Sequence, residues 1–140
     1  MADPLAIKDL ILAKLRAIPH IGGRVYDGGV TGAIPTDSHG FTLPYIVLYA
    51  GPGQFPGETL LDGTIGTDGR VIDFTTICVG PATTHATGVA VEVQKALTNL
   101  RAGTGRIRPN PDGFGVDVPY AGDGSPIRYM LPLQWRLNTN

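Results

Sequence analysis

The side chains that could carry out covalent catalysis are few, because the chain has two serines, one cysteine and three histidines. Ser38 and His39 are neighbours, and adjacent side chains of an extended chain point to opposite sides. We therefore expect them to be badly placed to share a proton, as a serine nucleophile requires. Cys78 and His85 lie on either side of a Gly-Pro pair and could meet at a corner between a strand and a helix. A cysteine in an apolar strand is, however, typical of a small buried hydrophobic side chain.

Metal and cofactor sites also lack a recognisable pattern. The three histidines come from separate segments, without the HxH or HxxxH spacing that supplies two zinc ligands from one element. Asp62-Gly63 and Asp68-Gly69 lack the alternating acidic ligands and the closing glutamate of a calcium loop. Gly51-Pro52-Gly53 lacks the Gly-Lys-Ser/Thr continuation of a phosphate-binding loop. The sequence therefore predicts no metal, no cofactor and no enzymatic activity.

Composition indicates one folded domain with long connections. The chain of 140 residues holds 20 glycines and 12 prolines, about twice their average share, yet 42% of its residues are hydrophobic, which is enough for a core. The formal net charge of -1 excludes the basic footprint of tight, sequence-independent binding to nucleic acid or anionic lipid. The single cysteine excludes an internal disulfide, and no apolar run is long enough for a membrane helix. We expect a single domain over residues 1–140, made in a cytoplasm, with no membrane partner.

Two segments have the three- and four-residue apolar spacing of an amphipathic helix. The first spans residues 4–18, and Asp3 ahead of Pro4 is the expected N-cap. The second spans about residues 84–100. Thr83 or Thr84 is expected to cap its start and Gly103 to close its end.

Strands are predicted between and after these helices, over residues 24–26, 44–49, 70–79, 106–108, 115–118 and 128–137. The 44–49 run is apolar and is expected to be buried on both faces. Pro132 cannot donate a ladder hydrogen bond, so the last strand is expected to lie at a sheet edge or to carry a bulge. This order of elements predicts an α+β fold, with two helices packed on one face of a mostly antiparallel sheet.

The candidate interaction surface combines one long connection with several arginines. Residues 51–69 contain six glycines, two prolines and no basic residue, and connections of this length are usually functional or mobile. We expect a flexible loop that becomes ordered against a neighbour. Arg106 and Arg108 share one face of a short strand, where they meet an acidic partner, nucleic acid or only solvent. The candidate interface comprises Gln54, Phe55, Glu58, Leu60, Leu61, Asp62, Ile65, Asp68, Arg106, Arg108, Arg128 and Arg136.

Several short motifs follow one another along nearly the whole chain. After the first helix come Val25-Tyr26-Asp27, then Pro44-Tyr45-Ile46-Val47-Leu48, Asp62-Gly63, and a Phe74–Gly80 run that leads into a helix rich in Ala and Val. A closing strand over 129–137 completes the series. In order and spacing this series resembles the tail terminator proteins of long-tailed siphophages.

The resemblance implies a small α+β subunit that forms a hexameric ring on the head-proximal end of the tail tube of a virion. There the ring ends tube growth and offers a docking face to the head connector. The implied partners are further copies of itself, the tail tube protein and the head-tail connector or head-completion protein, while genomic DNA passes through the lumen without specific binding. The family has no catalytic residues. A head-completion or connector ring subunit is the nearest alternative, and a small ligand-binding domain or hydrolase is the alternative from another class.

Overall fold

The computed structural model describes residues 3–53, 70–111 and 118–139. In these residues two helices and seven strands follow one another in the order α1 (Pro4–Arg16), β1 (Val25–Asp27), β2 (Tyr45–Ala50), β3 (Arg70–Gly80), α2 (Thr83–Leu97), β4 (Arg101–Ala102), β5 (Gly105–Pro109), β6 (Tyr120–Ala121) and β7 (Tyr129–Thr139). The predicted strand over 115–118 lies almost wholly outside the described residues.

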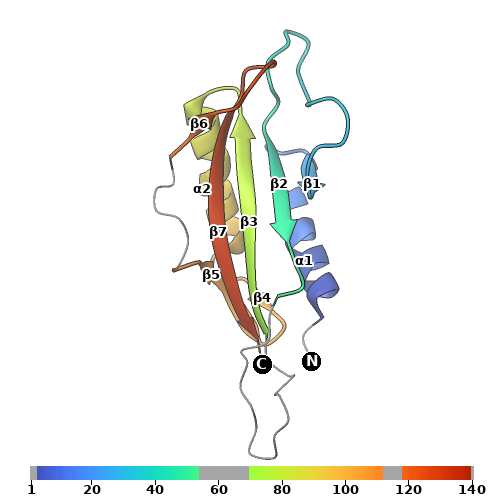
Figure 1. Cartoon of the computed structure of the whole chain (residues 1–140), viewed down its shortest axis with the longest axis vertical. Coiled ribbons are helices and arrows are strands. Elements are labelled where there is room, and N and C mark those ends of the chain that lie inside the picture. The colour runs from blue at the N-terminus through green and yellow to red at the C-terminus, as the bar shows by residue number, and fades with distance from the viewer. Residues whose placement is uncertain (1–2, 54–69, 112–117, 140) are drawn as a thin grey trace, which may run out of the picture.

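One sheet contains all seven strands, in the order β1-β2-β3-β7-β5-β4, with β6 paired to the start of β7. Every pairing is antiparallel except that of β1 with β2. The two longest strands, β3 and β7, pair over eleven residues at the centre. Both helices pack on one face of the sheet (Figure 1), which confirms the predicted α+β fold.

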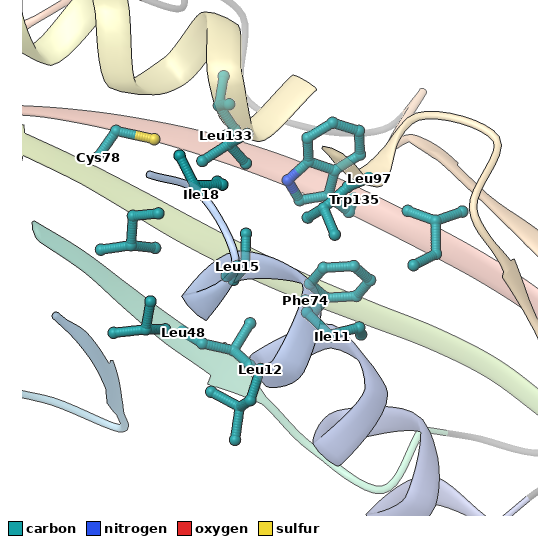
Figure 2. Close-up of a cluster of buried hydrophobic side chains, with 14 of the residues drawn as sticks. Ile11, Leu12, Leu15, Ile18, Leu48, Phe74, Cys78, Leu97, Leu133 and Trp135 are labelled. Atoms are coloured by element: carbon teal, nitrogen blue, oxygen red, sulfur yellow. The ribbon is translucent and has the colours of Figure 1, made fainter. Parts of the chain in front are cut away.

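The main core lies between the two helices and the sheet (Figure 2). Alternate residues of β3 and β7 point into it, because successive side chains of a strand face opposite sides. Trp135 stacks on Phe74 with their ring centroids 6.4 Å apart. Its indole Nε1 donates a hydrogen bond of 3.0 Å to Thr76 Oγ1, and both side chains are buried. Thr76 thus gives the largest core side chain its polar partner.

The first helix begins as predicted, since the Asp3 carboxylate accepts a hydrogen bond of 3.0 Å from the backbone N–H of Leu5. It ends at Arg16, two residues before the predicted end, and the chain continues in turns that still bury Ile18 and Ile21. Lys8 forms an ion pair of 2.9 Å with Asp27, which ties this helix to β1.

The predicted caps of the second helix are wrong. Its N-cap is Ala82, whose side chain cannot accept a hydrogen bond, and neither threonine that follows caps the start. The helix ends at Leu97 because the next residues join the sheet: the N–H of Asn99 donates to the carbonyl of Ile107, and the N–H of Ile107 donates to the carbonyl of Leu100. Gly103, with a φ of +60°, lies instead in the turn between β4 and β5.

The predicted edge position of the last strand is also wrong, because β7 lies between β3 on one side and β5 and β6 on the other. Pro132 pairs with Ile77 of β3. Residues two apart direct their backbone groups to the same edge, and the carbonyl of Gln134 accepts from Asn110, away from β3. Pro132 therefore turns its nitrogen to the stretch of β7 between its pairings with β5 and β6. In the described chain the proline displaces no ladder hydrogen bond.

Candidate functional site

The face of the sheet opposite the helices has two different halves. Near the start of β7 the loop after β1 covers it, and Val30 and Ile34 pack against the buried side chains of Tyr45, Val47 and Val79. Burial raises the pKa of the Tyr45 hydroxyl. This half is a second, smaller core. The first four residues of β2 are accordingly buried on both faces, as predicted.

The other half of this face carries arginines on three strands. Arg106 and Arg108 alternate with the buried Ile107 along β5. Arg108 lies directly opposite Arg136 of β7, and Arg106 lies directly opposite Arg101 of β4. Directly opposite residues have their Cβ atoms about 5 Å apart on the same face. The register thus places four arginines on one face of three neighbouring strands, and we call the hollow beside them the arginine groove.

The arginine groove is open and has a volume of about 620 Å³. Besides three of the arginines, it has short polar side chains and two prolines in its walls. The described residues that line it are Thr104, Arg106, Arg108, Pro109, Pro111, Arg136 and Asn138.

One carboxylate offsets part of this positive charge. Asp73 of β3 lies opposite Arg136 and accepts two hydrogen bonds from it, 2.8 Å from Nε and 3.2 Å from Nη2. These bonds hold the pKa of the Asp73 carboxyl below its usual value. Arg106 donates from Nη1 to the carbonyl of Asn99 at 3.0 Å.

Two pairs of like charges therefore face each other across neighbouring strands, an arrangement that destabilises a sheet. Within the described residues neither Arg101 nor Arg108 forms an ion pair or a side-chain hydrogen bond. A groove with more arginines than carboxylates among the described residues favours an anionic ligand, because carboxylates and phosphates match the fork of donors of a guanidinium group.

The structure brings together only some of the predicted interface residues. Arg106, Arg108 and Arg136 line the groove, whereas Arg128 lies eight residues before Arg136, about 27 Å away along the strand. Arg128 donates from Nη1 to the carbonyl of Pro126 at 3.3 Å. The other predicted interface residues lie outside the described residues: Gln54, Phe55, Glu58, Leu60, Leu61, Asp62, Ile65 and Asp68.

Arg101 shares this face of the sheet with the groove arginines but was not among the predicted residues. Its strand has two residues and no periodicity of its own. The available signal was the Gly103-Thr104 pair, a two-residue turn of the kind that closes a hairpin. Such a turn places Arg101 opposite Arg106.

The Ser38–His39 geometry differs from the prediction. Asp37 Oδ1 accepts hydrogen bonds from the backbone N–H groups of His39 and Phe41, both at 2.9 Å, and these bonds fold the segment into a turn. The neighbouring side chains consequently converge, with Ser38 Oγ 3.3 Å from His39 Nδ1 on the surface. The Asp37 oxygen that could orient the imidazole is engaged by the backbone.

Cys78 is buried, as predicted, and burial raises the pKa of its thiol to about 12. His85 lines a pocket of about 400 Å³ between the end of α1 and the start of α2, together with His20 and Glu92. Among the described residues no three His, Cys, Asp or Glu side chains are close enough to hold a metal ion. The helices described are too short or too polar to cross a membrane.

An exposed apolar patch lies at the opposite end of β7 from the arginine groove. Phe41 is 63% exposed and Ile127 is 72% exposed. Their loops are joined by a hydrogen bond of 2.9 Å from Thr42 Oγ1 to the carbonyl of Ile127. Tyr120, also exposed, lies at the same end of β7, on β6, where it pairs with Met130. We call these residues the apolar end.

Comparisons with known proteins show a likeness to a solved structure. No family model and no curated protein matches the chain. A chain of a solved structure described as the virion of a native gene transfer agent particle is similar, with a TM-score of 0.46 and 19% identity over 99% of this chain and 94% of that chain. The two surfaces therefore have to be interpreted from their own geometry and charge.

Proposed function

We propose that this chain is a structural subunit of a phage-like virion and, specifically, a tail terminator. In that role six copies form a ring on the head-proximal end of a tail tube, end its growth and dock the head connector or head-completion protein. The order of the short motifs in the sequence supports this role. The α+β fold, with both helices on one face of the sheet, agrees with what that resemblance implies.

The observation that carries the proposal is the presence of two chemically different surfaces at the two ends of β7. The apolar end lies beside Met130, and the arginine groove lies beside Arg136. Six residues of a strand separate these positions by about 20 Å. A ring placed between a tube and a connector must bind two different partners on opposite sides, and a subunit with a distinct surface at each end suits that task.

The sheet edge at β5 favours contact through side chains rather than through strand addition. Asn99 and Leu100 already use the outward backbone groups of Ile107. Two residues later Pro109 has no N–H to offer. An edge blunted in this way does not recruit further strands, so we expect neighbouring subunits to meet through groove and loop side chains.

Electron microscopy of assembled particles tests the proposal. We expect six copies at the head-proximal end of the tube, and tubes of uncontrolled length when the chain is depleted. Twelve copies on the portal side of the joint would instead assign the chain to the connector ring. Because the net charge is -1, we expect no tight retention of DNA in the lumen.

The pocket with His20, His85 and Glu92 is the feature that favours a ligand-binding domain or hydrolase instead. His20→Ala and His85→Ala test this alternative. A structural subunit tolerates both changes, so particle yield should be unchanged. A hydrolytic activity of the purified chain that either substitution abolishes would contradict the structural role.

A further inference from the structure

We propose that the arginine groove binds the acidic segment 54–69 of a neighbouring copy of this chain. This inference rests on the proposed ring, because a ring supplies each groove with a neighbour. It goes beyond the ring in naming the two surfaces that hold adjacent subunits together.

Charge is the first reason for this assignment. Among the described residues, the part of the sheet face that carries the groove has four arginines and one carboxylate. Residues 54–69 lie outside the described structure, but their sequence contains Glu58, Asp62 and Asp68 and no Lys, Arg or His. The groove and the segment thus have net charges of opposite sign and similar size.

The unfavourable register of the arginines is the second reason. Arg101 faces Arg106 and Arg108 faces Arg136, and these contacts cost stability in a subunit that stands alone. Carboxylates seated between the guanidinium groups would reverse the sign of that interaction. Local arrangements that oppose folding are commonly found where a partner binds.

Reach is the third reason. Both ends of the segment start from the end of the sheet that carries the groove, since Arg70 pairs with Thr139 and donates from Nη1 to the carbonyl of Pro52 at 3.0 Å. Half of the segment, if extended, spans at most about 28 Å. A segment of this reach can extend beyond the subunit that carries it.

The walls of the groove favour a polypeptide over nucleic acid. Asp73 lies beside Arg136 at the β3 side of the arginines and would repel a phosphate placed there. Pro109 and Pro111 offer apolar surface on one side, which suits side chains such as those of Leu60 and Leu61 in the acidic segment. A phosphate backbone would gain nothing from these prolines.

Charge reversal tests the pairing. The groove variant is Arg106→Glu with Arg108→Glu, and the segment variant is Glu58→Lys with Asp62→Lys and Asp68→Lys. Sedimentation velocity over a concentration series at low ionic strength, where exposed charges are least screened, measures self-association. We expect each variant alone to associate at least tenfold more weakly than the natural chain. The matched control, Lys14→Glu with Lys95→Glu, reverses two exposed charges on the helices and should associate normally.

Mixing the two variants in equal amounts is the decisive step. The negative groove of one then meets the positive segment of the other, so alternating copies should associate to within about threefold of the natural chain. Recovery in a single chain that carries all five substitutions, without recovery in the mixture, would place the segment on its own groove and overturn the proposal. Unchanged association of both variants would overturn it as well.

Two further outcomes separate this pairing from other assignments. A short DNA duplex that binds the natural chain and is lost by the groove variant would make the groove a nucleic-acid site and overturn the proposal. A natural chain that stays monomeric throughout the series would also overturn the pairing. It would leave the proposed ring standing if six copies are still found on assembled tubes.

Discussion

Replacing Thr76 by valine should destabilise the protein by about 2 kcal/mol. Valine has nearly the shape of threonine but cannot accept the hydrogen bond that Trp135 Nε1 donates at 3.0 Å. Both side chains are almost wholly buried, so water cannot replace the lost acceptor. A buried donor left without a partner costs about 1–3 kcal/mol.

Urea unfolding followed by far-UV circular dichroism measures this cost. With an m-value of about 2 kcal/mol/M, a loss of about 2 kcal/mol lowers the midpoint by about 1 M. Thr75→Val is the matched control, because Thr75 is the neighbouring threonine on the other face and is only half-buried. It should change stability by less than about 0.5 kcal/mol.

A double-mutant cycle with Trp135→Phe isolates the hydrogen bond. Phenylalanine has no N–H, so in that background Thr76→Val leaves no donor unsatisfied and should cost close to nothing. The coupling between the two sites should therefore be about 1–2 kcal/mol. An equal cost of Thr76→Val in both backgrounds would refute the reasoning, since the effect would then come from packing rather than from the indole.

Three other predictions concern a charge, two glycines and the thiol. Because its hydrogen bonds to Arg136 lower the pKa of Asp73, the pair stabilises the fold above the ordinary carboxyl pKa of about 3.9. That contribution is lost as the pH falls through the lowered pKa. The free energy of unfolding of Asp73→Asn should be lower than that of the natural chain by less than about 1 kcal/mol above this pH, because the pair is exposed, and the difference should vanish in acid. Gly105→Ala should cost about 3 kcal/mol in urea unfolding, because its Cβ would overlap a backbone carbonyl of β7, whereas Gly88→Ala has open space in α2 and should stabilise by up to about 1 kcal/mol. Cys78, with a thiol pKa of about 12, should react with a disulfide reagent at neutral pH only at the rate of unfolding; rapid labelling of the folded chain would contradict its burial.

The elements with a regular spacing of apolar residues could be predicted from the sequence. The apolar stripe of α2 and the alternation of β3 and β7 predicted three of the main core elements to within a few residues. Helix caps were mispredicted because sheet hydrogen bonds of Asn99 and Leu100 decide where α2 ends. Those bonds depend on β5, which follows α2 in the chain.

The position of β7 and the membership of the site were harder to predict for a related reason. A proline such as Pro132 is evidence against a central strand. β7 accommodates it because β5 and β6 are short, so the described part of β7 beside the proline nitrogen pairs with neither of them. Arg101, Arg108 and Arg136 become neighbours through the register of three strands. No local pattern contains that register, so the sequence paired only Arg106 with Arg108, and the structure added Arg136 to them in a groove.

The central position of β7 has a consequence for synthesis. The ribosome completes β3 about 50 residues before it begins β7, an interval of about 2.5–10 s at 5–20 residues per second. During that interval eleven residues of β3 have no partner on one side, and an unpaired strand of this length is a template for aggregation. The nascent chain is therefore most exposed to misassembly just before its last strand is made, and chaperone binding to ribosome-bound chains should peak in that window.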